Sequence, residues 1–214
     1  MEDAIPAARP TLGIIAGVLG VAAIVGFVAG GVFGSLNFSA AAGAGSALGT
    51  ESPAATAPIA LTVTEASCER EPRQDAAGEQ VDYRPEYAVD GDNQTGWQCD
   101  GDGVGQTLEL DLGGTAMVTR VGLVPGYAKR DPLDDRDWYP LFRRLTEVRW
   151  HFDAGDPVNQ QLDPDPEVRE LQALDLPQPR ETSTLRMEII SSTGGDTADR
   201  RVIAVTDIEV LAVQ

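Results

Sequence analysis

The sequence predicts an all-β domain, folded as a two-sheet β-sandwich, that follows one N-terminal transmembrane helix and a flexible linker. Three observations indicate this architecture: an uncharged apolar run near the N-terminus, a stretch of small residues after it, and short segments of alternating apolar and polar residues over the rest of the chain. The expected boundaries are a short cytoplasmic N-terminus over 1–11, the helix over 12–34, the linker over 35–58 and the sandwich over 59–214.

The run over 12–34 is long enough to cross a membrane. It contains only apolar residues and glycine, and at about 1.5 Å per residue a helix of this length spans a hydrocarbon core of about 30 Å. The alternative is a signal peptide cleaved near Ala40, but signal peptides have shorter apolar regions and a clearly basic start, whereas Arg9 is the only basic residue before this run. We therefore expect an uncleaved anchor.

The flanking charges and the glycines of this helix predict its orientation and a partner. Because no positive charge follows the helix closely, we expect the N-terminus in the cytoplasm and the bulk of the chain outside. Glycines four residues apart, such as Gly13 and Gly17, allow close approach of a second membrane helix. These features predict a single-pass protein of the bacterial cell membrane whose C-terminal domain is extracytoplasmic.

The segment over 35–58 reads as a tether. It consists largely of Ala, Gly, Ser, Thr and Pro and carries one charge, Glu51. Because such residues cannot build a core, we expect a flexible linker.

The charge of the chain restricts its partners. Acidic residues outnumber basic ones by 34 to 16, which gives a net charge of −18. Phosphate backbones repel a protein this acidic, so nucleic acid is excluded as a partner. Lys129 is the single lysine among many arginines, a bias that is typical of GC-rich bacterial genomes.

Apolar residues alternate with polar ones along the C-terminal region. In "QTLELDL" (106–112), "EVRWHFD" (147–153) and "TLRMEII" (184–190), every second residue is apolar, which is the pattern of a strand with one buried face. Four further short segments show strand character: "IALTVT", "MVTRVGLV", "ELQALDL" and "VIAVTDIEVLA". No long amphipathic helix is visible, so these strands predict a two-sheet sandwich.

Two cysteines, Cys68 and Cys99, flank the first long loop of this domain. Outside the membrane we expect them to form a disulfide. Closing a loop of about 30 residues would stabilise the fold by roughly 3 to 4 kcal/mol. The alternative, half of a zinc site, needs two further ligands, and the single histidine, His151, is predicted on an outward strand face.

Catalytic motifs are missing from the sequence. It has no G-x-S-x-G elbow and no G-x-x-x-x-G-K-[ST] loop. Acidic pairs are frequent, as expected by chance in so acidic a chain. We therefore predict that the protein is not an enzyme.

The stretch "YAVDGDNQTGW" (87–97), with "GQTLELDLG" after it and a terminal "TDIEVLA", resembles the discoidin family, also called coagulation factor 5/8 type C or galactose-binding-like. The middle stretch "VGLVPGYAKRDPLDDRDWYPLFRRLTEVRWHFDAG" resembles one bacterial branch, the NADase-type glycan-binding domain. The resemblance covers about 60–213 and implies a jelly-roll sandwich.

The resemblance also implies one structural calcium ion. Asp90 and Asp92 would supply carboxylates, Thr95 its hydroxyl and backbone oxygens, Tyr87 or Ala88 a backbone carbonyl, and Glu209 would close the shell from the last strand. Trp97 would pack beneath the loop. An EF-hand is excluded because Gln94 and Gly101 break its pattern. The alternative is a calcium-free turn held by Asx hydrogen bonds.

Candidate ligand contacts lie in "PGYAKRDPLDDRDWYPLFRR" (125–144), because the family binds ligands with loops at one end of the sandwich. Aromatic rings that could stack on a sugar are Tyr127, Trp138 and Tyr139; cations that could bond hydroxyls or carboxylates are Lys129, Arg130, Arg143 and Arg144. The alternative is that Trp138 and Tyr139 fill the core and that the Asp/Arg mixture forms surface ion pairs. The chain departs from relatives that carry Asn before the Arg, because Phe142 stands there.

Two functions follow from these features. The first is a membrane-tethered carbohydrate-binding or adhesion module whose partner is an envelope glycan. The second is a non-catalytic structural subunit that docks on another envelope protein, recruited by the membrane helix.

Overall fold

The computed structural model describes residues 55–75, 77–194 and 201–214. The predicted transmembrane helix over 12–34 and most of the predicted linker lie outside these ranges. Within the ranges described, no helix is long and apolar enough to cross a membrane.

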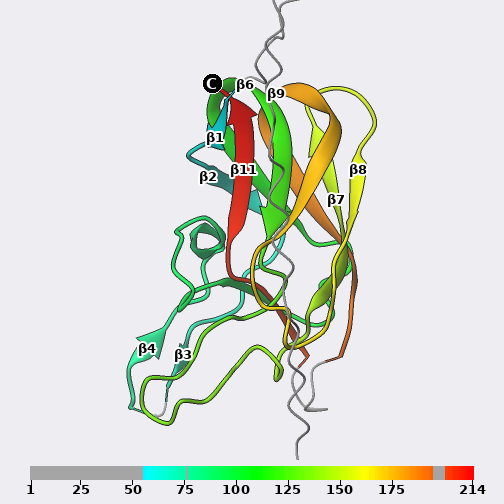
Figure 1. Cartoon of the computed structure of the whole chain (residues 1–214). Coiled ribbons are helices and arrows are strands. Elements are labelled where there is room, and N and C mark those ends of the chain that lie inside the picture. Colours follow the sequence, from blue (N-terminus) through cyan, green and yellow to red (C-terminus); the bar gives the residue numbers. More distant parts are fainter. Residues whose placement is uncertain (1–54, 76, 195–200) are drawn as a thin grey trace, which may run out of the picture. The chain divides into compact units, whose positions relative to one another are not determined.

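An antiparallel sheet forms the main body of the domain (Figure 1). Its strand order is β1 (Thr56–Pro58), β11 (Ile208–Val213), β6 (Thr107–Leu123), β9 (Gln172–Ser192), β7 (Leu145–Phe152) and β8 (Val158–Gln161), and β2 (Thr62–Ala66) also pairs with β6. Two smaller pairs complete the strands: β5 (Trp97–Asp100) with β10 (Val202–Val205), and β3 (Arg73–Gln74) with β4 (Gln80–Val81). A single-turn 3₁₀ helix, η1 (Pro85–Ala88), ends within the 87–97 stretch.

The structure confirms an all-β sandwich but merges segments that were predicted as separate strands. Strand β6 contains most of both 106–112 and 117–124, and β9 contains most of 170–176 and all of 184–190. The register between β6 and β9 shifts between Asp111 and Ala116, where Gly113 and Gly114 adopt φ values of 74° and 149°. Glycine tolerates these angles, so the strand bends there instead of ending.

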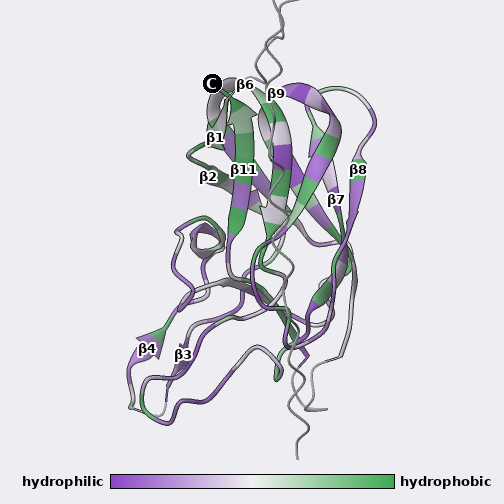
Figure 2. Cartoon of the chain, in the orientation of Figure 1, coloured by the Kyte–Doolittle hydropathy of each residue, from purple (hydrophilic) through white to green (hydrophobic). Residues whose placement is uncertain are grey.

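The buried faces follow the predicted alternation. Leu108 and Leu110 of β6, Trp150 of β7 and Leu185 and Met187 of β9 are fully buried. Burying one such side chain stabilises the fold by about 1.5 to 3 kcal/mol relative to exposure. Hydrophobic and hydrophilic residues alternate along these strands in Figure 2, because successive side chains point to opposite faces of a sheet.

The predicted disulfide is confirmed: Cys68 and Cys99 are bonded, with their Cα atoms 5.8 Å apart. Cys99 lies on β5 and is buried, next to the fully buried Trp97. The bond therefore anchors the chain that precedes the β3–β4 hairpin to the core.

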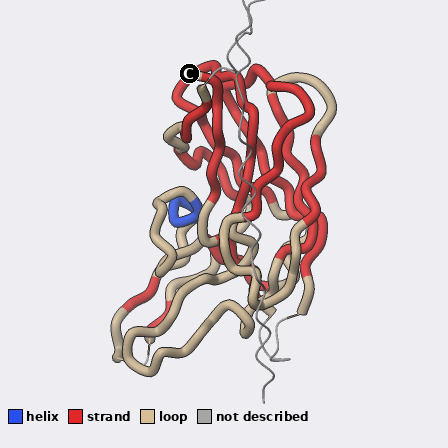
Figure 3. The backbone as a smooth tube through the Cα atoms, viewed as in Figure 1, coloured by secondary structure: helices blue, strands red, loops and turns tan. Residues whose placement is uncertain are grey.

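Loops gather at one end of the domain (Figure 3). The β3–β4 hairpin projects there, whereas β1 begins at the opposite end, beside the C-terminus (Figure 1). Strand β1 pairs Thr56 with Val213 of β11. The last residues assigned to the linker therefore belong to the sandwich, because their backbone completes an edge of the main sheet.

Candidate functional site

A groove of about 510 Å³ lies at the loop end, between the β3–β4 hairpin and the loop over 126–142. Its floor is aromatic. Tyr127 and Phe142 are buried with ring centroids 5.2 Å apart, and the Trp138 ring meets Phe142 edge-on at 6.1 Å. Burial raises the pKa of Tyr127 above its usual value, which already exceeds physiological pH. Its hydroxyl is therefore neutral there. These rings form a small apolar cluster with Val202 and Ala204 of β10.

Cationic side chains line the walls of the groove. Arg70, Arg73, Lys129 and Arg136 all contribute to its lining. The Arg136 guanidinium lies 5.2 Å from the centroid of the Trp138 ring, and that of Arg70 lies 5.1 Å from the centroid of Tyr83. Such cation–π contacts hold each cation against a flat apolar surface, which places charge and stacking area side by side.

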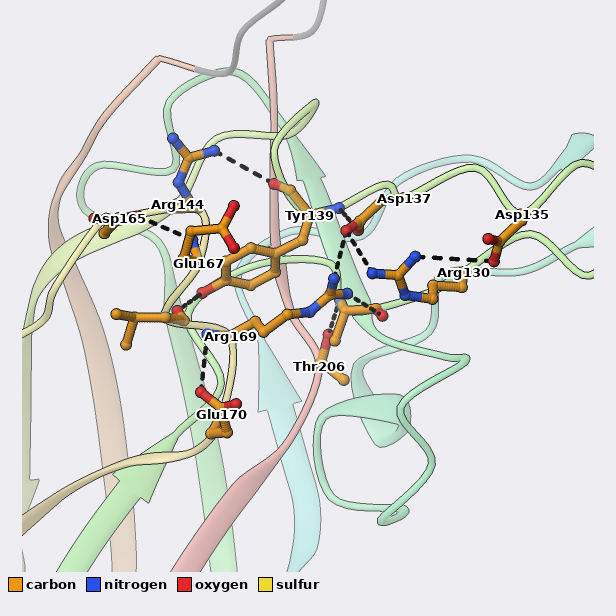
Figure 4. A network of polar contacts seen from close by, with 12 residues as sticks. Arg130, Asp135, Asp137, Tyr139, Arg144, Asp165, Glu167, Arg169, Glu170 and Thr206 are labelled. Atoms are coloured by element: carbon orange, nitrogen blue, oxygen red, sulfur yellow. Dashed lines mark hydrogen bonds and ion pairs between the residues drawn. The ribbon is translucent and has the colours of Figure 1, made fainter. Parts of the chain in front are cut away.

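The 126–142 loop is braced against the segment over 163–170 (Figure 4). The Arg169 guanidinium donates hydrogen bonds to the Asp137 carboxylate and, at 3.0 Å, to the carbonyl oxygen of Ala128. The Tyr139 hydroxyl donates to the carbonyl oxygen of Val168 at 2.9 Å. Because these bonds join two loops, they fix the position of the groove wall without regular secondary structure.

Arg144 completes this brace from inside the domain. Its Nε donates to the carbonyl oxygen of Pro164 at 2.6 Å, and its Nη1 donates to three carbonyl oxygens of 139–142. The side chain is 5 % exposed. A buried guanidinium needs its donors satisfied, and here backbone oxygens satisfy them.

The 87–97 stretch forms a tight turn beside η1. Asp90 accepts hydrogen bonds from the Asp92 amide at 2.9 Å and the Thr95 hydroxyl at 2.8 Å, and Asp92 accepts from the Gln94 amide at 2.8 Å. These are the Asx hydrogen bonds of the calcium-free alternative. Trp97 lies fully buried after the turn, and its indole N–H donates to the Cys68 carbonyl at 2.8 Å.

A third carboxylate, Asp207, lies near this turn. Burial raises its pKa, and the charges of Asp90 and Glu209 raise it further. Sequence reasoning missed Asp207, although it directly precedes the β11 strand that carries Glu209. Within the ranges described, no three Asp, Glu, His or Cys side chains come together at ligating distances. Carboxylate and hydroxyl oxygens are the kind of ligand that calcium prefers. In this structure, however, the carboxylates of Asp90 and Asp92 accept hydrogen bonds within the turn.

Residues 61–211 match the family model described as NAD glycohydrolase translocation F5/8 type C domain. The chain belongs to this family. No curated protein matches it.

Solved structures similar to this F5/8 type C domain include carbohydrate-binding modules. The family 32 module of Clostridium perfringens NanJ, solved in complex with galactose, has a TM-score of 0.50 and 16% identity, over 73% of this chain and 99% of its own. The family 32 module of Streptococcus pneumoniae EndoD has a TM-score of 0.49 and 10% identity, over 72% and 98% of the two chains. At 16% identity, the likeness to the NanJ module shows the fold alone.

The F5/8 type C fold separates the predicted ligand residues into two groups. Tyr127, Lys129 and Trp138 line the groove. The other four predicted residues lie outside the groove. Tyr139 and Arg144 are buried inside the domain. Arg130 forms surface ion pairs with Asp135 and Asp137, and the backbone of Arg143 forms an isolated β-bridge with Ile203 of β10. Tyr139 fills the core, as the alternative interpretation held, because Gly126 leaves room for its ring; a Cβ there would lie 2.6 Å from Tyr139 Cε2.

The hairpin contributes groove residues that sequence reasoning missed. Arg70, Arg73 and Tyr83 line the groove from a segment to which no role was assigned. The cysteine spacing could have indicated this segment. These residues lie within the 31-residue interval that the cysteine pair closes, so a disulfide there brings the segment back to the core.

Proposed function

We propose that this protein is a membrane-anchored, extracytoplasmic carbohydrate-binding module of a bacterial envelope, and that the groove binds a glycan. The observation that carries the proposal is the groove itself, in which the Trp138 and Tyr83 rings stand beside cationic side chains on two braced walls. Sites for small ligands are mostly apolar, with a few polar groups that fix orientation. An aromatic ring offers a stacking surface to the apolar face of a sugar.

The position of the groove suits a tethered receptor. The chain enters the sandwich at β1, at the end opposite the β3–β4 hairpin (Figure 1). A tether attached before β1 would therefore join the sandwich at the end opposite the hairpin that lines the groove.

Calcium is proposed as a structural ion of the turn that contains Asp90. Burial raises the pKa of Asp207, and repulsion from the charges of Asp90 and Glu209 raises it further. A divalent cation would offset this repulsion and would need the Asp90 and Asp92 carboxylates to exchange hydrogen bonds for metal bonds.

The binding proposal is tested with the full chain in a non-ionic detergent and insoluble cell-wall polysaccharide. Retention of the wild type and loss of retention in Trp138→Ala, with Met117→Ala unchanged, is the expected result; Met117 is exposed on β6 and does not line the groove. Far-UV circular dichroism and melting temperature show that each variant is folded. A stoichiometric envelope protein that co-purifies, together with no polysaccharide retention, would instead support the docking-subunit function.

A further inference from the structure

We infer that the groove selects an anionic glycan, a polymer whose units carry a carboxylate or a phosphate, and that Arg73 and Lys129 bind the negative group. The inference rests on the proposed glycan-binding function of the groove and names the class of glycan. Arg73 comes from β3 and Lys129 from the 126–142 loop, so the two cations stand on the two walls.

The groove has the opposite charge balance to the chain. Four basic side chains line it, against three acidic ones, Asp75, Asp131 and Asp134. Over the whole chain, acidic residues exceed basic ones by 34 to 16. A random patch of this protein would therefore be acidic, whereas the groove contains four of the 16 basic side chains.

The three acidic side chains of the groove are engaged in closing its turns. Asp75 accepts hydrogen bonds from the amides of Ala77 and Glu79, both at 2.9 Å, at the tip of the hairpin. Asp131 accepts from the Leu133 amide at 3.0 Å, and Asp134 accepts from the Arg136 amide at 3.1 Å. Backbone donors thus hold these carboxylates, which shape the walls.

Two of the four cations already have an acidic partner. Arg136 pairs with Asp134 at 2.7 Å, and Arg70 pairs with Asp100 at 3.3 Å. Among the residues that the structure describes, the ion pairs do not include Arg73 or Lys129. Within the described part of the chain these two groove cations have no carboxylate partner, which favours a ligand that brings the negative charge.

The net charge of the protein does not prevent anion binding. Exposed charges act over a Debye length of about 8 Å at physiological ionic strength, so most of the acidic surface is screened from a ligand in the groove. Direct contacts with a guanidinium and an ammonium group are charge-assisted hydrogen bonds and are hardly screened. The local cations therefore decide the sign of the preferred ligand.

The aromatic floor alone would bind neutral and anionic sugars alike. Selection is therefore measured as a ratio between matched polymers. The probes are a polyuronate, the same polymer with its carboxylates methyl-esterified, and a phosphodiester-linked polyol polymer, each titrated into the full chain in non-ionic detergent at fixed salt.

We expect the polyuronate, or else the phosphodiester polymer, to bind at least tenfold more tightly than the methyl ester. A preference for the polyuronate would identify a carboxylate as the bound group, and a preference for the phosphodiester polymer would identify a phosphate. Arg73→Gln and Lys129→Met should each lower the affinity for the anionic polymer about tenfold or more and leave the affinity for the ester unchanged. The matched control is Arg186→Gln, an exposed arginine of β9 outside the groove, which should alter neither.

The outcomes separate the inference from the function on which it rests. If the methyl ester binds as tightly as the polyuronate and the phosphodiester polymer binds no better, the selection for anions is overturned while glycan binding stands. If none of the three polymers binds the folded wild type, both are overturned. If both lining variants match the wild type on the anionic polymer, Arg73 and Lys129 are not the binding residues and the inference fails.

Discussion

The indole N–H of Trp97 donates a hydrogen bond of 2.8 Å to the backbone carbonyl of Cys68, whose side chain is bonded to Cys99, two residues beyond that tryptophan. The same short strand thus holds Cys68 twice, once through a covalent bond and once through a buried hydrogen bond. Because Cys68 begins the segment that carries Arg73 and Tyr83, these two bonds position one wall of the groove.

The double variant Cys68→Ser, Cys99→Ser should lower the free energy of unfolding by about 3 to 4 kcal/mol, since the unfolded chain regains the freedom of a loop of about 30 residues. The measurement is denaturant unfolding of the wild type and variant at one pH. Trp97→Phe is the comparison: it keeps a ring in the core and should cost less, because it removes one hydrogen bond and some packing. Equal stability of wild type with and without reductant would contradict the prediction.

Removing Arg169 should loosen the loop over 126–142. In Arg169→Met the Ala128 carbonyl loses its side-chain donor, and the Asp137 carboxylate keeps only its bonds from Arg130 and the Tyr139 amide. We expect faster amide hydrogen exchange in 128–139 and weaker polysaccharide retention, with the sheet unaffected. Arg130→Gln is the matched control, because its pairs with Asp135 and Asp137 lie within the same loop on the surface. Unchanged exchange in Arg169→Met would show that Tyr139 and Arg144 hold the loop without it.

Acid should destabilise the domain partly through Asp153. The Thr184 hydroxyl and the Ser183 amide donate to its carboxylate and lower the pKa from 3.8 to about 2. An acid whose pKa is lower in the folded state stabilises the fold above its unfolded pKa, and this contribution is lost as the pH falls through the folded pKa. Stability should therefore decline between pH 4 and about 2.

The check is urea unfolding of the wild type and Asp153→Asn across that range. The variant should be less stable at pH 5 and should show a shallower decline below pH 4, because it has no carboxylate to protonate. Asp156→Asn, an exposed neighbour, serves as the control. Parallel curves for wild type and Asp153→Asn would refute the assignment.

Calcium should raise the melting temperature if the turn at Asp90 binds it. An ion that binds the folded state stabilises by about 2.7 kcal/mol at a hundredfold excess over its Kd, which is a shift of several degrees for a domain of this size. Glu209→Gln and Asp92→Asn should both weaken the response. Identical melting of the wild type in calcium and in chelator would leave the Asx turn as the correct interpretation.

Asp207 gives the same hypothesis a second readout. An acid whose pKa is raised by folding stabilises the fold only below its unfolded pKa, and this contribution is lost as the pH rises through the folded pKa. In chelator at neutral pH, Asp207→Asn should therefore melt higher than the wild type, because it removes a half-buried charge beside Asp90. In calcium the order should reverse if Asp207 helps to bind the ion.

The sequence by itself determined which faces are buried and which cysteines meet. Leu108, Leu110 and Leu112 are buried as their alternation predicts, because the pleat of a strand sends every second side chain to the same side. The cysteine pair followed from two thiols and an expected oxidising environment. Both inferences rest on local pattern and composition, which do not need knowledge of the partner strand.

Only the tertiary structure decided how the strands join and which aromatic residue is available to a ligand. The sequence predicts separate strands over 106–112 and 117–124, but one strand continues through Gly113 and Gly114 because β9 pairs with it on both sides of the bend. Trp138 and Tyr139 are adjacent in sequence, and the sequence allows either ligand contact or core packing for both. In the structure Trp138 lines the groove, whereas Tyr139 fills the core beside Gly126. Loops have no periodicity, so the space left by distant residues decides where each side chain goes.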